Sequence, residues 1–282
     1  MSNKVAAVQM VSTADIHQNI ESATKLIKEA ADQGASLILL PENFAVLDGG
    51  PLKQFGEVEG DLDALLQKFL SEQARTHGII LVAGTIPLIS RPAVAGEDQP
   101  DLLQDRRVRP ACLVFDSEGI VIARYDKIHL FDVVVEDKQA EYSESRSFEP
   151  GETVVSLETP LGHLGLSVCY DLRFPELYRK LFEAGAQIVT IPSAFTKITG
   201  AAHWEALLRA RAIENQCYII AANQGGKHNR TRETYGHSMI IDPWGAILDC
   251  VADGEGVAIA NINLDALTRI RANMPIATHR RL

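Results

Sequence analysis

Several features that define other classes of protein are scarce in this sequence, and positive charge is the first of them. The 282 residues include 27 Lys and Arg side chains against 37 Asp and Glu, for a formal net charge of −10. Proteins that follow a nucleic-acid backbone need a stripe of positive charge. We therefore expect no nucleic-acid partner, and we expect an anionic substrate to be captured by individual Arg or Lys side chains.

Cysteine pairs and metal-ligand motifs are missing as well. Cys112, Cys169, Cys217 and Cys250 are far apart and form no CxxC pair, and no HExxH segment is present. This spacing argues against a zinc site and against a disulfide framework. We expect neither a metal nor a cofactor, and the free thiols indicate a reducing, cytoplasmic location.

Long apolar runs are the third absence. No segment approaches the ~20 consecutive apolar residues that a membrane-spanning helix needs. The first ten residues, Met1–Met10, lack the apolar stretch of a secretion signal. We expect a protein that does not associate with membranes.

The pattern that is present alternates strands with helices. Lys4–Met10, Ser36–Leu40 and Ile79–Ile86 read as apolar strands, whereas Ile16–Gln33 and Asp61–His77 have helical periodicity, the second with Asp61 as its N-cap. Strands that alternate with helices are typical of α/β proteins. Hydrophobic residues make up 46% of the chain and no break in composition marks a linker, so we predict a single domain over residues 1–282.

Later segments add hairpins to this pattern. Pro110–Phe115 and Ile120–Tyr125 are predicted to pair, Val134–Gly151 reads as a long charged loop, and helices are predicted at Pro175–Ala184 and His203–Asn215. A loop of that length inside a domain suggests a function. We expect two sheets that meet inside the domain, with helices on their outer faces.

Three reactive side chains, Glu42, Lys127 and Cys169, each stand within two residues of the end of a predicted strand. These strands are Leu37–Leu40, Val121–Tyr125 and Leu164–Val168. In α/β sheets, ligands tend to bind outside the carboxyl ends of the strands. If the three strands are parallel neighbours, a carboxylate, an ammonium and a thiol meet at one end of the sheet. Taken singly, a buried thiol is more often a small hydrophobe, and the two charges are more often solvated.

Together the three groups suit the hydrolysis of an amide. Lys127 would favour the thiolate of Cys169, and Glu42 would take the thiol proton and return it to the leaving amine. Attack on the amide carbon creates an oxyanion, which Lys127 and the backbone N–H of Tyr170 would hold. The product of this step is a thioester on Cys169.

At these residues the sequence resembles a known family. Pro41–Asn43, Tyr125–Asp132 and Ser167–Glu176 are similar to the three signature motifs of the nitrilase superfamily, the carbon–nitrogen hydrolases with a Glu-Lys-Cys triad. The resemblance covers nearly the whole chain. It implies a four-layer α-β-β-α sandwich and a homodimer or higher homo-oligomer.

The resemblance also implies a second glutamate in the active site, within the long charged loop. Glu144–Gly151 is similar to the segment that carries it, which assigns the role to Glu144. Glu141 is the competing assignment.

Within the superfamily, the closest likeness is to the Nit branch. Pro192–Thr196, Thr199–Glu214, Tyr235–Met239 and Asp242–Gly245 resemble its members that act on deaminated glutathione. This implies a small-molecule amidase whose products are 2-oxoglutarate and cysteinylglycine. An omega-amidase that acts on 2-oxoglutaramate is the near alternative.

Two residues are candidates for binding a substrate carboxylate. Arg173 would pair with it in a bidentate manner, unless it forms a structural ion pair with Asp171 or Glu176. Thr199, in the predicted loop before the next helix, would donate a hydrogen bond, unless its hydroxyl serves as a turn or cap.

Three other readings remain open. A nitrilase that acts on a C≡N group uses the same chemistry, although the Nit-type segments argue against it. An inactive protein that keeps the fold as a binding scaffold is a second reading, but all three triad residue types are present. A papain-like protease would need a Cys–His pair with an orienting Asn, and no Cys motif of that kind is present.

Overall fold

The strands of the first sheet are apolar on both faces, which places this sheet inside the molecule. Along β2 (Leu37–Leu39), Leu37 and Leu39 pack in one hydrophobic cluster and Ile38 packs in another. Successive side chains of a strand point to opposite faces, so each face of this sheet is covered by an apolar layer. The computed structural model describes residues 3–48, 50–61, 63–93 and 100–281.

The first sheet has the strand order β17-β1-β2-β3-β5-β4, with β6 paired to β5. Strands β1, β2 and β3 are parallel to one another and β17 is antiparallel to β1, whereas β5 and β6 form the antiparallel hairpin predicted from the sequence. The strands are β1 (Lys4–Gln9), β2, β3 (Ile80–Val82), β4 (Ile86–Leu88), β5 (Arg109–Phe115), β6 (Val121–Asp126) and β17 (Gly256–Asn261).

The second sheet has the order β16-β15-β12-β11-β10-β9. Its centre, β10 to β12, is parallel, and the flanking strands are antiparallel. The strands are β9 (Ser156–Thr159), β10 (Gly162–Leu166), β11 (Ile188–Thr190), β12 (Tyr218–Ala221), β15 (Ser238–Ile241) and β16 (Ile247–Val251).

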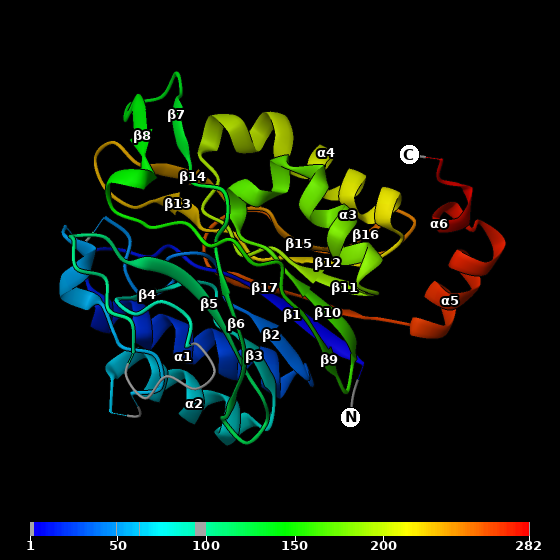
Figure 1. Cartoon of the computed structure of the whole chain (residues 1–282), viewed down its shortest axis with the longest axis horizontal. Helices are drawn as coiled ribbons and strands as arrows, with labels where there is room; N and C mark the ends of the chain where they lie inside the picture. Colours follow the sequence, from blue (N-terminus) through cyan, green and yellow to red (C-terminus); the bar gives the residue numbers. More distant parts are fainter. Residues whose placement is uncertain (1–2, 49, 62, 94–99, 282) are drawn as a thin grey trace.

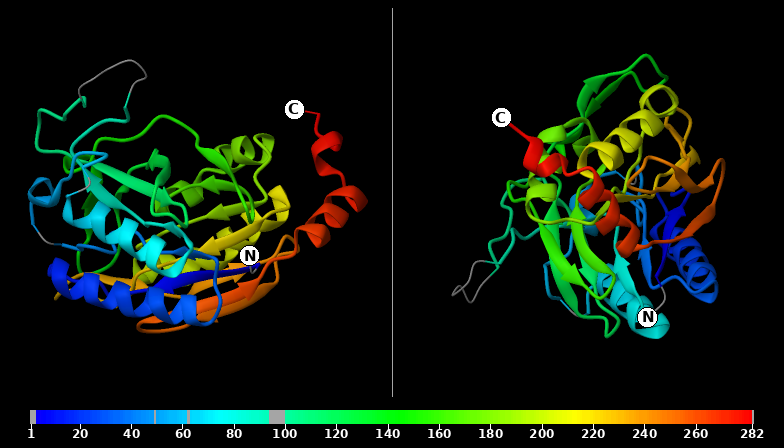
Figure 2. Two further views of the ribbon diagram at one scale, coloured as in Figure 1. Left: turned by 90° about the horizontal axis from the view of Figure 1, so that it is seen from below. Right: turned by 90° about the vertical axis from the view of Figure 1, so that its right-hand side faces the viewer.

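Helices cover the outer face of each sheet (Figures 1 and 2). Ala23 and Leu70, from α1 and α2, pack with the outer face of the first sheet, whereas Leu181 and Trp204, from α3 and α4, pack with the second. The helices are α1 (Ile16–Asp32), α2 (Leu65–His77), α3 (Pro175–Glu183), α4 (Lys197–Asn215), α5 (Leu264–Asn273) and α6 (Ile276–His279). This four-layer arrangement confirms the predicted α-β-β-α sandwich.

Short elements lie between the layers and at their edges. They are the 3-10 helices η1 (Leu52–Phe55), η2 (Glu144–Arg146) and η3 (Cys169–Arg173), and the strands β7 (Asp132–Val134), β8 (Glu141–Ser143), β13 (Gly225–Lys227) and β14 (Glu233–Tyr235). The predicted loop Val134–Gly151 therefore contains regular secondary structure, namely β8 and η2. Across the described part of the chain, we find no helix with the length and apolar character needed to cross a bilayer.

Helix α2 begins later than predicted, because its first turn is capped from a distance. It starts at Leu65 rather than after Asp61, and Leu62, expected on its core face, lies outside the described residues. The carboxylate of Glu57 accepts hydrogen bonds from the backbone N–H groups of Leu66 and Gln67. A capping group this far upstream leaves no local sequence signal.

Helix α4 begins earlier than predicted, at Lys197 rather than His203. The hydroxyl of Thr196 caps it by accepting a hydrogen bond of 3.4 Å from the backbone N–H of Thr199. Thr199 consequently lies in the first turn of the helix and not in a loop, so the predicted setting of this residue was wrong.

The predicted strand Ile79–Ile86 is divided into β3 and β4 by a turn at Gly84. This glycine has φ +61°, and a Cβ atom there would lie 2.1 Å from the carbonyl oxygen of Pro41. Only a residue without a side chain fits this close backbone approach. The turn therefore presses against the segment that leads to Glu42.

Candidate active site

Glu42, Lys127 and Cys169 meet although they come from different sheets. Glu42 and Lys127 follow β2 and β6, which run in the same direction in the first sheet but are separated by β3 and β5, whereas Cys169 follows β10 of the second sheet. The three strands are therefore not parallel neighbours in one sheet. Face-to-face packing of the two sheets brings the strand ends together.

The loop that carries Glu42 is held by contacts on several sides. The backbone N–H of Asn43 donates a hydrogen bond of 2.9 Å to the hydroxyl of Thr85, beside the Gly84 turn. The side-chain amide of Gln224 donates a hydrogen bond of 3.1 Å to the carbonyl of Glu42. These contacts fix a carboxylate that is only 3% exposed.

Lys127 lies between two carboxylates at the centre of the site. Its Nζ atom is 2.7 Å from Oε1 of Glu42 and 2.8 and 3.0 Å from the two oxygens of Glu144. The second oxygen of Glu144 also accepts a hydrogen bond of 2.8 Å from the backbone N–H of Phe131. Glu141, the competing assignment, lies on exposed β8 and pairs with Arg146 at 3.2 Å.

Cys169 is the first residue of η3, at the sharp turn that follows β10. Its φ angle is +49°, a left-handed conformation that is unfavourable for a residue with a side chain. Its backbone N–H donates a hydrogen bond of 2.9 Å to the carbonyl of Pro192. The neighbouring N–H of Tyr170 belongs to the first turn of η3, where backbone N–H groups have no acceptor within the helix.

A buried aspartate, Asp171, ties this turn to the segment that carries Lys127. Its carboxylate accepts hydrogen bonds from the hydroxyl of Tyr125 (2.6 Å), the backbone N–H of His129 (3.0 Å) and the backbone N–H of Val168 (2.8 Å). Burial first, and then the Asp171 charge, raise the pKa of Tyr125 well above its usual value. Sequence reasoning considered Asp171 only as a partner of Arg173, although it stands two residues from Cys169.

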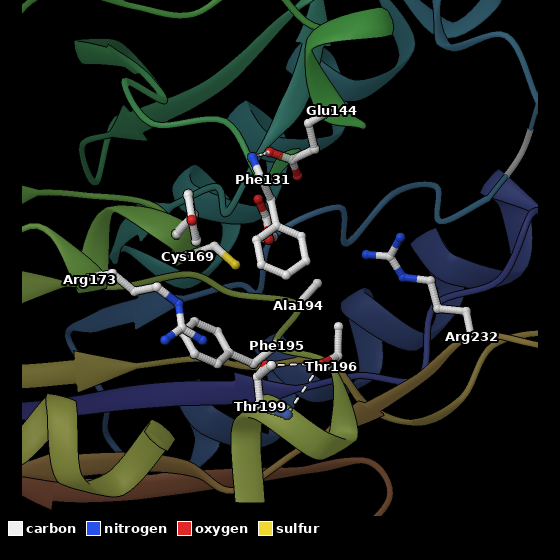
Figure 3. A pocket seen from close by; sticks show the side chains of 11 residues that line it. Phe131, Glu144, Cys169, Arg173, Ala194, Phe195, Thr196, Thr199 and Arg232 are labelled. Atoms are coloured by element: carbon white, nitrogen blue, oxygen red, sulfur yellow. Dashed lines mark hydrogen bonds between the residues drawn. The ribbon is translucent and has the colours of Figure 1, made fainter. Parts of the chain in front are cut away.

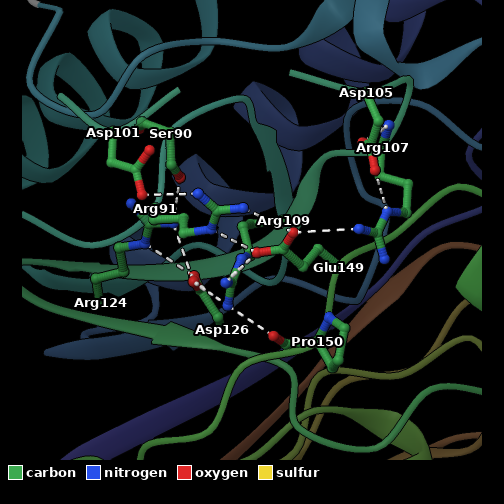
Figure 4. Close-up of polar contacts among 10 residues, drawn as sticks. All are labelled: Ser90, Arg91, Asp101, Asp105, Arg107, Arg109, Arg124, Asp126, Glu149 and Pro150. Atoms are coloured by element: carbon green, nitrogen blue, oxygen red, sulfur yellow. Dashed lines mark hydrogen bonds and ion pairs between the residues drawn. The ribbon is translucent and has the colours of Figure 1, made fainter. Parts of the chain in front are cut away.

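An ion-pair network holds the segment after Glu144 against β5 (Figure 4). Glu149 accepts hydrogen bonds from Arg91 (2.7 Å), Arg107 (3.3 Å) and Arg109. Further along, the backbone N–H of Gly151 donates to the carbonyl of Lys127 at 2.8 Å. The ion pairs of Glu149 hold the segment that follows Glu144, and the hydrogen bond from Gly151 holds the backbone of Lys127. Together they fix the two residues relative to each other.

The protonation states of the site follow from burial and from the balance of charges. Burial by itself would lower the pKa of Lys127, but the charges of Glu144 and Glu42 hold it well above its usual value. Burial raises the pKa of Glu42, against the opposing charge of Lys127. The lysine is therefore an ammonium, and Glu42 is a stronger base than an exposed carboxylate.

The pKa of the Cys169 thiol is raised rather than lowered. Burial and the negative charge of Glu42 raise its pKa well above the usual value, and Lys127 opposes them only in part. Lys127 does favour the thiolate of Cys169, but two carboxylates accompany this one cation and, together with burial, outweigh it. Attack by this sulfur requires a base in contact with it.

A pocket of about 290 Å³ opens onto the sulfur of Cys169 (Figure 3). Its walls combine aromatic, hydroxyl and charged side chains. They are Glu42, Phe131, Glu144, Cys169, Tyr170, Arg173, Ala194, Phe195, Thr196, Thr199 and Arg232. A wider pocket of about 730 Å³ shares Phe131, Glu144 and Arg232 with the first, so the two adjoin on that side.

Arg173 lines the inner pocket without a carboxylate partner among the described residues. Its guanidinium lies over the rings of Tyr170 and Phe195, at 5.8 and 5.3 Å from their centres, and contacts Nδ1 of His203 at 3.3 Å. The alternative ion pair with Asp171 or Glu176 does not form in this structure. The cation therefore faces the pocket.

Thr199 also reaches the pocket, where its hydroxyl lies 2.9 Å from that of Thr196. Sequence reasoning did not find Thr196, Phe131 or Arg232. Phe131 lies four residues after Lys127 in the same motif, which was an available signal. Arg232 comes from a segment with no recognisable pattern. Within the described ranges, no cluster of His, Cys, Asp and Glu side chains is arranged to hold a metal ion.

Comparison with known proteins gives the class to which this fold and site belong. The family described as carbon-nitrogen hydrolase matches residues 4–272, and the chain belongs to this family, within the nitrilase superfamily. It is a hydrolase that acts on carbon–nitrogen bonds other than peptide bonds.

Individual relatives are similar over almost the whole chain. A protein of Yersinia enterocolitica named deaminated glutathione amidase is 42% identical over 98% of this chain and 92% of its own length. Among solved structures, Nit3 of Saccharomyces cerevisiae, a member of branch 10 of the nitrilase superfamily, has a TM-score of 0.84 at 30% identity and covers 99% of this chain and 96% of its own. The C. elegans NitFhit protein has a TM-score of 0.84 at 36% identity and covers 99% of this chain, which spans 65% of that longer protein.

Proposed function

We propose that this protein hydrolyses the amide of deaminated glutathione to 2-oxoglutarate and cysteinylglycine. The observation that carries the chemistry is the position of Lys127, which is held between Glu42 and Glu144 and is near enough to Cys169 for the two charges to interact. The substrate is supported by the name of the Yersinia enterocolitica relative. The unpaired guanidinium of Arg173 in the pocket fits a substrate that carries a carboxylate next to its keto group.

In the first half of the reaction, Glu42 takes the proton of the Cys169 thiol as the sulfur attacks the amide carbon. The negative charge that develops on the amide oxygen is held by the Lys127 ammonium and the backbone N–H of Tyr170. Such donors contribute about 3 kcal/mol each to the stabilisation of comparable transition states. Glu42 then gives its proton to the nitrogen of the departing amine, the carbon–nitrogen bond breaks, and a thioester remains on Cys169.

In the second half, Glu42 takes a proton from a water molecule as its oxygen attacks the thioester carbon. The tetrahedral intermediate uses the same two oxyanion donors. Its collapse breaks the carbon–sulfur bond, and the sulfur of Cys169 recovers the proton from Glu42. Glu144 keeps Lys127 charged and in place through both halves, since it accepts two hydrogen bonds from Nζ.

The acyl side of the substrate fits the inner pocket. Arg173 would bind the 2-oxo acid carboxylate, and the hydroxyl of Thr199 would donate a hydrogen bond to the same group. Both side chains line the pocket around the Cys169 sulfur. Asp171 does not touch the pocket and acts by positioning Cys169 and the segment after Tyr125.

The first experiment compares the wild type with Cys169→Ala on deaminated glutathione and on 2-oxoglutaramate, with release of 2-oxoglutarate as the signal. Strong turnover of the first substrate that is lost in Cys169→Ala supports the proposal. A preference for 2-oxoglutaramate would make the protein an omega-amidase with the same mechanism. Normal turnover by a folded Cys169→Ala variant would refute the mechanism.

We also propose that residues 1–282 form one domain that assembles as a homodimer or higher homo-oligomer in the cytoplasm. Edge strand β16 and the turn before it expose large apolar side chains. Trp244 is 67% exposed, and Ile247 and Leu248 are 40% and 41% exposed. An exposed, apolar strand edge favours association with another chain. Sedimentation equilibrium of the wild type and of Trp244→Ser tests the assembly.

A further inference from the structure

Arg232 lies across the pocket from Arg173, at the junction of the inner and outer pockets. It comes from the turn between β13 and β14 and lines both spaces, together with Phe131 and Glu144. Figure 3 shows the two guanidinium groups on opposite sides of the pocket, with the Cys169 sulfur between them in this view. Of these two guanidinium groups, the proposed mechanism uses only that of Arg173.

The guanidinium of Arg232 is held in place but incompletely bonded. It lies over the ring of Tyr142, 5.4 Å from its centre, and its nearest carboxylate among the described residues is that of Asp48 at 3.7 Å. Its Nε atom is buried and has no hydrogen-bond partner in the described part of the chain. Guanidinium carries five donors, and a buried donor without an acceptor is unfavourable. The donors on the two terminal nitrogens, which are not buried in this way, remain for an incoming acceptor in the pocket.

We propose that Arg232 binds the carboxylate at the leaving-group end of the substrate and thereby selects a dipeptide leaving group over ammonia. This inference rests on the proposed function. Deaminated glutathione has a carboxylate at each end, with the reacting amide between them. If Arg173 holds the carboxylate of the acyl part, the cysteinylglycine part extends past Glu144 into the outer pocket.

The lining of the two pockets supports this placement. Two extended residues span at most about 7 Å from the reacting nitrogen. The outer pocket of about 730 Å³ begins at Glu144, which touches Lys127, and Arg232 lines it. A planar guanidinium suits bidentate pairing with a carboxylate. Since 2-oxoglutaramate releases only ammonia, none of its atoms extends to Arg232 once the acyl part is bound.

The test uses three substrates: deaminated glutathione, the same compound with its glycine carboxylate replaced by a carboxamide, and 2-oxoglutaramate. We expect the wild type to lose on the order of 10- to 100-fold in kcat/KM, mainly through KM, when the carboxylate becomes a carboxamide. In Arg232→Gln, the acid and the carboxamide should become equivalent within about threefold, and the preference for deaminated glutathione over 2-oxoglutaramate should fall by the same factor.

Arg230→Gln is the matched control, because it removes the same charge from an exposed position in the same turn. It should keep the wild-type preference. Equal turnover of acid and carboxamide by the wild type would overturn the inference without any variant. An equal loss on all three substrates in Arg232→Gln would also overturn it, since that is the effect of a structural role. If the wild type does not hydrolyse deaminated glutathione at all, the proposed function itself fails.

Discussion

The hydroxyl of Tyr125 donates a hydrogen bond of 2.6 Å to the carboxylate of Asp171, and this contact joins the two sheets behind the site. Tyr125 stands two residues before Lys127, and Asp171 stands two residues after Cys169. Both side chains are fully buried. The relative position of the ammonium and the thiol therefore depends on a bond that neither of them makes.

Tyr125→Phe should lower both stability and activity. Removal of one donor from a buried carboxylate costs about 1–3 kcal/mol of unfolding free energy, which urea denaturation measures. Because Lys127 and Cys169 lose a shared anchor, kcat should fall on deaminated glutathione and on 2-oxoglutaramate alike. Tyr218→Phe is the control, since Tyr218 is at the start of β12, at the end opposite to the carboxyl end of the strand, and its hydroxyl contacts Asn263. It should lose stability and keep kcat, and a Tyr125→Phe enzyme with unchanged kcat would contradict the positioning role.

The pH dependence of kcat/KM should have an acid limb above pH 4.5. Glu42 must be ionised to take the thiol proton, and burial raises its pKa above the ordinary value of 4.5, so activity is lost as pH falls through that raised value. The charge of Glu144 raises the pKa of Glu42 further. In Glu144→Gln, the limb should therefore move to lower pH while kcat falls.

Glu141→Gln is the matched control for this profile. Its carboxylate is exposed and pairs with Arg146 rather than Lys127. The limb of this variant should coincide with that of the wild type. A limb that stays in place in Glu144→Gln, or that moves in Glu141→Gln, would contradict the assignment of Glu144.

The sequence predicted the layers of the fold and the grouping of Glu42, Lys127 and Cys169, because strand ends and motifs are local features of the chain. It did not predict the start of α2, because this start is determined by the carboxylate of Glu57, eight residues upstream. The raised pKa of Cys169 depends on how many carboxylates lie near one ammonium, and only the packed structure shows that number.

Arg232 escaped prediction for the same kind of reason. Its neighbours Tyr142 and Asp48 are distant in the sequence, and no periodicity or motif connects them. Thr199 was found, but its setting was not, since the Thr196 cap stands seven residues before the predicted start of the helix. The catalytic and binding roles of these residues stay predictions until the variants are measured.

Glu149→Gln should destabilise the protein in a pH-dependent manner. Hydrogen bonds from Arg91 have the largest effect on the Glu149 carboxyl and lower its pKa. Burial raises the pKa, but hydrogen bonds from Arg109 lower it again, so the pKa of Glu149 stays below its ordinary value. A carboxylate whose pKa is lower in the folded protein than in the unfolded chain stabilises the fold at every pH above its unfolded-state pKa. This stabilisation is lost as the pH falls through the folded-state pKa. At pH 7 the variant should lose about 1.5–3 kcal/mol, the usual range for hydrogen bonds to a charged group.

The difference between Glu149→Gln and the wild type should shrink as the pH falls below the ordinary carboxyl pKa of 4.5 and through the lowered pKa of Glu149, which thermal or urea unfolding at several pH values measures. Glu158→Gln provides the comparison, because its side chain is 80% exposed and pairs only with His163. Its stability should match that of the wild type at every pH. A constant difference for Glu149→Gln across the pH range would show that the ion pairs with the arginines are not its cause.

Gly84→Ala should damage the site through the backbone, and Gly78→Ala is an unusually close control. Both glycines have φ +61°, so alanine meets the same left-handed strain of about 1–2 kcal/mol at either position. At Gly78 a Cβ atom has nothing within 4 Å, whereas at Gly84 it would lie 2.1 Å from the carbonyl oxygen of Pro41. The Pro41–Asn43 segment must then move, and Glu42 moves with it.

We therefore expect Gly78→Ala to lose only the strain energy and to keep its kcat. Gly84→Ala should lose more unfolding free energy than Gly78→Ala, and its kcat should fall at least tenfold, since the Glu42 carboxylate no longer lies 2.7 Å from Lys127 Nζ. Urea denaturation and steady-state kinetics of the two variants separate the effects. Equal stability losses together with equal kcat values would mean that the Gly84 turn does not position Glu42, and the contact between β3 and the Glu42 loop would then have no part in the reaction.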